Sequence, residues 1–189
     1  MDMIDREWAE DGPAIEALLD RSFGPRRQTL SSYALRSGSP FYHLGRVARD
    51  HDRRMVGAVR FWPVMVQDSL NGRQFTALLL GPLAIDPSRR GQRLGRALMR
   101  AALRAVDEDG DFDCVLLVGS RAYFEPHGFR PVLPRYVTLP GNRDADRLMV
   151  RHGRSGNPMP AVGQLVPRLG RVPEQRAETP APAACTASR

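Results

Sequence analysis

The stretch from Leu78 to Arg100 constrains the fold of this chain more than any other part of its sequence. Two apolar runs, Leu78–Leu80 and Leu83–Ile85, are together long enough for a buried central strand. Gly81-Pro82 stands between them, and because proline has no amide hydrogen and glycine commonly marks a bulge, strand pairing should fail there. Asp86-Pro87-Ser88 then ends the strand and can cap a helix. The stretch therefore predicts an interrupted strand that leads directly into a helix.

That helix is predicted from Arg93 to Asp107, because apolar residues recur on one face after Gly91 and Gly95. The first N–H groups of a helix have no partner within it, and the helix dipole places partial positive charge at the same end. A glycine-punctuated, arginine-rich helix start is typical of an anion site, and phosphate is its usual occupant. The hypothesis is a phosphate-bearing cofactor that lies across the interrupted strand.

Length and composition favour one domain with irregular portions. The chain has 189 residues, of which 42% are hydrophobic, with 16 prolines and 17 glycines. No apolar run approaches the roughly 20 residues that span a bilayer, and residues 1–25 show no secretory signal. Cys114 falls in an apolar run and Cys185 in a Pro/Ala-rich tail, so no structural disulfide is expected. We therefore expect a cytoplasmic protein with no membrane partner.

The charge favours anionic partners. The net charge is +7, and every basic residue is an arginine. A polyanionic cofactor or acidic substrates fit this balance, and nucleic acid is the less favoured alternative. Arg96, Arg100 and Arg104 recur every four residues, which is more typical of a solvated helix face than of a nucleic-acid stripe. No His/Cys/Asp/Glu set has metal-ligand spacing, so no metal is expected.

The part of the chain before the central strand predicts two helices and then a meander. A helix should begin near Asp11, with Ile15, Leu18, Leu19 and Phe23 on its buried side, and a weaker one should cover Thr29–Arg36. Strands are predicted at Tyr42–Arg49 and Met55–Trp62. Asn71-Gly72 is a strong hairpin signal, so the central strand should be reached through an antiparallel hairpin.

The part after the central helix predicts a parallel strand and then small elements. Cys114–Val118 is a short apolar run, and strand–helix–strand at this spacing should place it parallel to Leu78–Ile85. A short helix at Gly119–Pro126 and two short strands between Arg130 and Leu139 should follow. Residues 1–150 are expected to form the domain, and residues 154–189, rich in proline, alanine and arginine, a disordered tail.

Two common phosphate loops do not fit the Arg90–Gly95 turn. The dinucleotide pattern needs two glycines one residue apart, whereas Gly91 and Gly95 are separated by three residues. The P-loop needs a lysine, and the chain has none.

Two motifs instead resemble the GNAT superfamily of N-acetyltransferases. Leu83-Ala84-Ile85-Asp86-Pro87 followed by Arg90-Gly91-Gln92-Arg93-Leu94-Gly95 resembles its acetyl-CoA-binding motif, Gln/Arg-x-x-Gly-x-Gly/Ala. Tyr123-Phe124-Glu125-Pro126-His127-Gly128-Phe129 resembles its second landmark, an aromatic pair followed by Gly-Phe. Order and spacing agree over roughly residues 3–140. The implied fold is α/β (α+β): a mixed, mostly antiparallel sheet with a central splayed pair of parallel strands and flanking helices.

The resemblance also implies an enzyme that moves an acetyl group from acetyl-CoA to a primary amine by direct attack. The pantetheine arm would lie along backbone groups of Leu83, Ala84 and Ile85, and the Leu83 N–H would polarise the thioester carbonyl. The remaining cofactor-binding residues would be those of the loop and the helix start: Arg90, Gly91, Gln92, Arg93, Leu94, Gly95 and Arg96. The acceptor would be a small metabolite, a peptide N-terminus or an aminoacyl-tRNA.

The chain departs from the family pattern at two positions. Arg93 replaces the middle glycine of the first motif. Phe124 stands where the family often has a tyrosine that protonates the departing thiolate, which makes the neighbouring Tyr123 the candidate acid although adjacent helical residues point about 100° apart. Three interpretations stay open: an acetyltransferase, a degenerate module that binds acyl-CoA or RNA, and an α+β domain that binds no anion.

Overall fold

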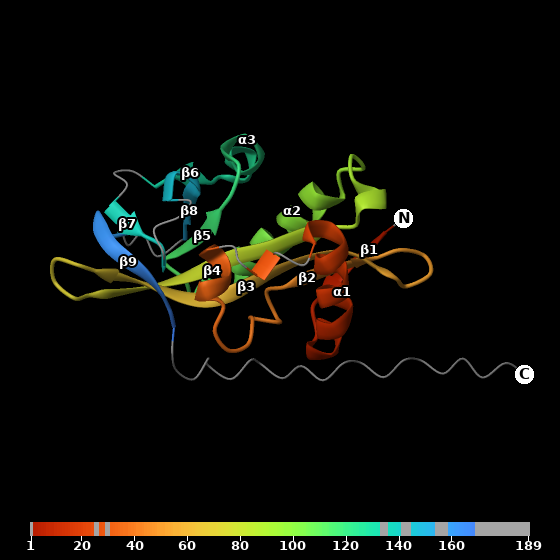
Figure 1. Cartoon of the computed structure of the whole chain (residues 1–189), viewed down its shortest axis with the longest axis horizontal. Helices are drawn as coiled ribbons and strands as arrows, with labels where there is room; N and C mark the ends of the chain where they lie inside the picture. The colour runs from red at the N-terminus through yellow and green to blue at the C-terminus, as the bar shows by residue number, and fades with distance from the viewer. Residues whose placement is uncertain are drawn as a thin grey trace, which may run out of the picture.

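One mixed sheet runs through the whole molecule, and the two main helices lie over the same end of it (Figure 1). The computed structural model describes residues 2–24, 27–28, 31–132, 136–140, 145–153 and 159–168. The strands are β1 (Met3–Arg6), β2 (Arg46–Arg49), β3 (Met55–Asp68), β4 (Gln74–Ile85), β5 (Cys114–Val118), β6 (Arg130–Pro131), β7 (Tyr136–Thr138), β8 (Leu148–His152) and β9 (Val162–Pro167). The α-helices are α1 (Gly12–Phe23), α2 (Leu94–Asp109) and α3 (Arg121–Phe124), and the 3₁₀ turns are η1 (Ala9–Asp11), η3 (Ser31–Leu35), η4 (Pro87–Arg89), η5 (Glu125–His127) and η7 (Ala145–Arg147).

Helices α1 and α2 cover opposite faces of the sheet. Successive side chains of a strand point to opposite faces. In β2, Val47 packs with the buried residues of α1, whereas the next residue, Ala48, packs with those of α2. Leu18 of α1 and Leu98 of α2 have no exposed surface. The sheet is therefore buried on both sides at this end, which explains the nearly continuous apolar sequence of β4.

The predicted hairpin and the predicted parallel pair are both confirmed. β3 and β4 pair antiparallel, and Gly72 takes a positive φ of 72° at the turn between them. β4 and β5 pair parallel, joined by α2, over the three positions from Ala77↔Cys114 to Leu79↔Leu116. All other strand pairs among the described residues are antiparallel except β7 with β9. The mixed, mostly antiparallel sheet predicted from the sequence is the one observed.

The two parallel strands separate after Leu79↔Leu116. Beyond that point β4 stays paired with β3 as far as Ile85, whereas β5 stays paired with β8. The register between β3 and β4 shifts between Val59 and Phe61, opposite Gly81-Pro82. The predicted interruption of β4 and the predicted splay of the central pair are therefore both present.

Three expectations about local structure were inaccurate. Phe23, expected on the buried side of α1, is 49% exposed, because as the last residue of the helix it lines a pocket instead of packing in the core. Within the described part of Thr29–Arg36, the second helix is only the 3₁₀ turn η3, and among residues 32–35 only Leu35 is buried. One turn with so little buried apolar surface has no face to support a longer helix. The strand expected from Tyr42 begins at Arg46, because residues 42–44 form a turn.

The expected disordered tail is corrected by β9. Within residues 154–189, Val162–Pro167 pairs antiparallel with the second half of β3, and Leu165 is fully buried. The pairing is close, since a Cβ on Gly163 would lie 2.7 Å from the Gln67 carbonyl oxygen. The proline and arginine content of the tail hid this short apolar segment. Residues 169–189 lie outside the described part, and none of the described helices is long and apolar enough to cross a membrane.

A buried ion pair joins β1, β3 and α1. Glu7, directly after β1, has no exposed surface and accepts a hydrogen bond of 2.8 Å from Arg60 Nε of β3. Arg60 also reaches Glu16 of α1 at 3.4 Å. Burial raises the pKa of Glu7 to about 7, although Arg60 acts in the opposite direction. At neutral pH this carboxyl group is therefore close to its titration midpoint.

The pKa of Glu7 predicts stability that falls with rising pH. A carboxyl group with a higher pKa in the folded state contributes fully below its ordinary pKa of 4.5, and the contribution is lost as the pH rises through about 7. Relative to Glu7→Gln, which cannot titrate there, the wild type should lose about 3 kcal/mol of unfolding free energy between pH 4.5 and 8. Urea denaturation at a series of pH values measures this, and a difference independent of pH contradicts it.

Candidate active site

The turn that joins β4 to α2 is fixed by a cap and by contacts with α1. The Asp86 carboxylate accepts hydrogen bonds from the backbone N–H and the hydroxyl of Ser88, at 3.1 and 2.8 Å. The bond from the Ser88 hydroxyl is the main cause that lowers the pKa of Asp86. Arg21 donates to Asp86 at 3.2 Å, and Arg90 donates to the Ser22 carbonyl at 3.0 Å. Asp86 thus caps the turn η4 rather than α2, and the turn is held against α1.

A cavity of about 520 Å³, here called the loop pocket, lies at the start of α2. Four arginines and no carboxylate line it, so its electrostatic character is cationic. It contains seven of the ten predicted cofactor-binding residues. Its lining residues are Ile85, Arg89, Arg90, Gly91, Arg93, Leu94, Gly95, Arg96 and Tyr123.

The three other predicted cofactor-binding residues lie elsewhere. Leu83 lines the second pocket described below. Ala84 is fully buried against α1, so only its backbone could take part in binding. Gln92 is exposed, and its amide nitrogen donates to the Ser88 carbonyl at 3.4 Å.

The backbone at Arg93 explains why glycine is usual at this position. Arg93 precedes the first residue of α2 and has φ 62° and ψ 7°, in the left-handed region. A side chain in this region costs roughly 1–2 kcal/mol, which glycine avoids. Arg93 therefore keeps the turn geometry of the motif and adds a guanidinium group to the loop pocket, at a cost in stability.

Substitution of Arg93 separates its strain from its charge. Arg93→Gly and Arg93→Ala both remove the guanidinium group, but only glycine relieves the left-handed backbone. We expect the free energy of unfolding of Arg93→Gly to be about 0.5–1 kcal/mol higher than that of Arg93→Ala. The strain that glycine relieves in the folded state exceeds the conformational entropy that it adds to the unfolded chain. Denaturant unfolding of the two variants measures the difference. A less stable glycine variant would contradict it.

Tyr123 and Phe124 point into different pockets. The Tyr123 hydroxyl lies 2.6 Å from the position that a Cβ on Gly95 would take, so Tyr123 closes one side of the loop pocket. Partial burial raises the pKa of Tyr123, opposed by Arg96. Phe124 instead lies over Gly119 and lines the gap between β4 and β5. The expected divergence of these neighbours is present, and it places the phenol away from the gap.

A smaller cavity of about 250 Å³, here called the strand pocket, fills the gap between the splayed strands. The Trp62 indole donates to the Gly81 carbonyl at 2.8 Å and so supports the interruption of β4 at the mouth of the gap. The pocket has an apolar wall and two arginines, with no carboxylate among its lining residues. These residues are Phe23, Ser32, Tyr33, Arg36, Leu80, Gly81, Pro82, Leu83, Leu117, Val118, Phe124 and Arg147.

The polar residues of the strand pocket were not predicted from the sequence. Tyr33 and Arg36 are three residues apart, the spacing at which side chains stack on one helical turn, and this was the available signal. The Arg36 guanidinium carbon lies 3.8 Å from the centre of the Tyr33 ring. Arg147 comes from the turn before β8, far along the chain, and no local pattern marks it.

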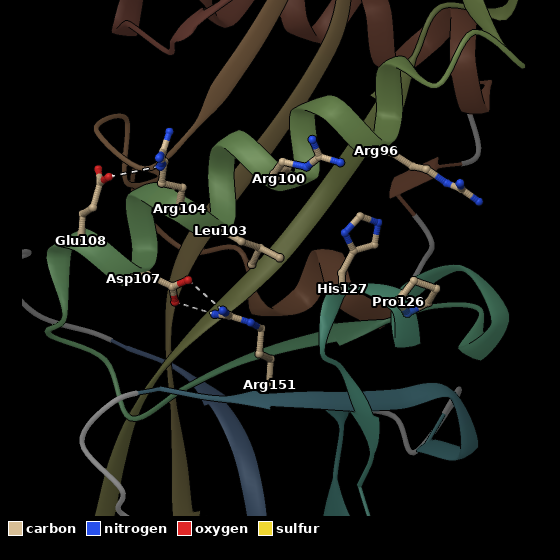
Figure 2. Close-up of a pocket in the computed structure, with 9 residues that line it drawn as sticks. All are labelled: Arg96, Arg100, Leu103, Arg104, Asp107, Glu108, Pro126, His127 and Arg151. Atoms are coloured by element: carbon tan, nitrogen blue, oxygen red, sulfur yellow. Dashed lines mark hydrogen bonds and ion pairs between the residues drawn. The ribbon is translucent and has the colours of Figure 1, made fainter.

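The arginines along α2 form one wall of an open groove of about 780 Å³ (Figure 2). Arg104 pairs with Glu108 at 3.5 Å, and Arg151 makes a bidentate pair with Asp107 at 2.7 and 2.8 Å. Arg100 and Arg96 lie near His127, whose pKa is lowered by partial burial and then by these two arginines. The groove therefore has mixed charge at one end and is cationic at the other, where Arg96 also lines the loop pocket.

Two other groups of residues carry no catalytic argument. Cys114 is buried in β5, and burial raises the pKa of its thiol to about 12, so the thiol is not a nucleophile. Against the expectation of no metal-ligand set, Asp50, His51 and Asp52 could place three ligand atoms within 4.8 Å of one another. His51 and Asp52 are exposed, on a turn outside the loop and strand pockets.

Comparison with known proteins decides the family. A family model described as an acetyltransferase (GNAT) domain matches residues 41–131. YhbS of Escherichia coli strain K12, named as an uncharacterized N-acetyltransferase, is 36% identical over 119 residues, which cover 63% of this chain and 68% of that protein. The chain belongs to the GNAT superfamily of N-acetyltransferases.

Solved structures agree with this GNAT assignment. The crystal structure of E. coli YhbS in complex with CoA matches with a TM-score of 0.65 at 27% identity, over 86% of this chain and 88% of that one. A GNAT acetyltransferase from Brucella melitensis, in complex with acetyl-CoA, matches with a TM-score of 0.63 at 19% identity, over 89% and 97%. The second match shows the fold alone.

Proposed function

We propose that this GNAT protein transfers an acetyl group from acetyl-CoA to a primary amine by direct attack. The observation that carries the proposal is that β4 connects two pockets of complementary character. Its end leads into the cationic loop pocket, and its interruption opens into the mainly apolar strand pocket. Acetyl-CoA has the same division, with anionic phosphates at one end and a neutral thioester at the other.

The loop pocket fits the pyrophosphate. The N–H groups of Leu94 and Gly95, the first two of α2, have no acceptor within the helix, whereas that of Arg96 donates to the Arg93 carbonyl at 3.1 Å. Arg90, Arg93 and Arg96 add positive charge beside them. Gly91 has a φ of 79° and open space at its Cβ position, so backbone can approach a phosphate there. The crystal structure of E. coli YhbS in complex with CoA supports CoA as the ligand class.

The free edge of β4 would hold the pantetheine arm. Leu83, Ala84 and Ile85 lie between the two pockets, beyond the point where β5 leaves β4. We assign their backbone groups to the arm and the Leu83 N–H to the thioester oxygen. In the transfer step the amine nitrogen bonds to the thioester carbon, the carbon–sulfur bond breaks, CoA leaves as a thiolate, and the proton lost by the amine passes to solvent.

Calorimetry and a turnover assay test this proposal together. Acetyl-CoA and CoA should both release heat on titration, and thiol should be released when an amine from a broad panel is added. No heat with either nucleotide would refute the proposal. Binding without thiol release for any amine would support the alternative suggested by Phe124. In that alternative the protein holds acyl-CoA without turnover.

Exchange of the two aromatic residues tests which side chain could protonate the thiolate. Phe124→Tyr places a phenol in the strand pocket, and if thiolate protonation limits the rate, kcat should rise about tenfold or more. Tyr123→Phe should leave kcat unchanged and raise the KM for acetyl-CoA, because its hydroxyl lies in the loop pocket. Steady-state thiol release measures both. If Tyr123→Phe abolishes kcat, the acid is Tyr123, as expected from the sequence.

A further inference from the structure

The strand pocket contains a half-buried cation, Arg36, that the proposed transfer reaction does not use. Arg36 lies between Tyr33 and the interruption of β4, and its Nη2 is 3.4 Å from the position that a Cβ on Gly81 would take. Its Nε is buried and has no hydrogen-bond partner. Burial lowers the pKa of Arg36, although an arginine side chain remains charged at neutral pH. A buried guanidinium nitrogen without a partner is costly unless a ligand completes it.

The position of Arg36 is set by packing and not by a carboxylate. Arg27, itself held by Asp20 at 2.8 Å, donates to the Tyr33 hydroxyl at 2.8 Å, and Arg36 stacks on the Tyr33 ring. The Arg36 Nη2 donates a hydrogen bond to the Ser32 hydroxyl at 3.2 Å. No ion pair joins Arg36 to an acid among residues 2–24, 27–28, 31–132, 136–140, 145–153 and 159–168.

The carboxylate whose charge acts on Arg36 is already engaged. Glu16 has one oxygen hydrogen-bonded to Arg27 and the other to Arg60. A second guanidinium group, that of Arg147, lines the same pocket. The wall between them is apolar, with Leu80, Pro82 and Phe124 among its residues. The pocket therefore combines positive charge with a hydrophobic surface and offers no group to attract a second cation.

We propose that the acceptor is a small amino acid-like molecule, whose carboxylate binds Arg36 while its amine faces the thioester. This inference rests on the proposed function and specifies its acceptor. Arg36 lies directly beside the interruption of β4, so one or two carbons between the carboxylate and the amine suffice. The cavity of about 250 Å³ suits one amino acid with an apolar side chain. Polyamines and lysine side chains would meet the like charge of Arg36 without a carboxylate to pair with it, and a protein N-terminus has no carboxylate next to its amine.

Binding of reaction products tests the proposal without depending on turnover. The probes are N-acetylated leucine, methionine and phenylalanine and the carboxamide of each, titrated calorimetrically into the CoA-loaded protein. Each acid should bind at least about tenfold more tightly than its carboxamide, because a charge-assisted bond to a half-buried guanidinium is strong. Arg36→Gln should remove this difference, and Arg36→Lys should restore part of it.

Two controls separate binding from a structural effect. Arg73→Gln removes an arginine that stacks on Phe75 outside the pocket, and it should leave the acid-to-carboxamide ratio unchanged. Thermal unfolding of each variant shows whether the Arg36–Tyr33 stack is needed for the fold. If Arg36→Gln does not fold, the ratio measured with Arg36→Lys decides the question, since it must fall between one and the wild-type value.

The outcomes distinguish the proposed ligand class from the proposed transfer reaction. Three outcomes would overturn the inference. They are equal affinity for acids and carboxamides, an acid-to-carboxamide affinity ratio that substitution of Arg36 leaves unchanged, and no binding of any acid at millimolar concentration. Selective binding of acids that depends on Arg36, with no thiol release from any amine, would support the ligand class and refute the transferase. Rapid acetylation of amines that lack a carboxylate would support the transferase and refute the ligand class.

Discussion

The separation of β4 from β5 after Leu79↔Leu116 is the constraint on which the whole site depends. Up to that pair the two strands are paired with each other, and beyond it β4 is paired with β3 and β5 with β8. Gly81-Pro82 and the Trp62–Gly81 hydrogen bond lie where the gap opens. The separation exposes a strand edge, makes room for the strand pocket, and lets α2 begin at the far end of that edge. A continuous β4–β5 ladder would remove both the proposed binding edge and the acceptor cavity.

The fold and the grouping of residues in the loop pocket could be predicted because their signals are local. Glycine and proline in β4, the Asn71-Gly72 turn and the apolar periodicity of α2 each depend on a few adjacent residues. The same holds for the glycine-rich turn, whose residues lie together in the loop pocket. Arg93 replaces the middle glycine of the family motif, and the structure shows that it adopts the left-handed backbone usual for glycine. A local pattern was thus preserved although the residue changed.

The acceptor end could not be predicted because its residues come from distant segments. Tyr33 and Arg36 precede β2, Phe124 follows β5, and Arg147 precedes β8. Only the packing of these segments around the gap brings them together. The strand β9 was missed for a related reason, since Val162–Pro167 is defined by the open edge of β3 and not by its own composition. Contacts between distant segments are also what the proposed acceptor specificity depends on.

A crystal structure of the protein with acetyl-CoA tests the central claim most directly. The account predicts that the pyrophosphate contacts backbone N–H groups between Gly91 and Arg96. It also predicts that the pantetheine arm follows the edge of Leu83–Ile85 and that the acetyl group lies in the gap between Leu80 and Leu117. Acetyl-CoA bound outside the loop and strand pockets, or with its acetyl group directed away from the gap, would contradict the account.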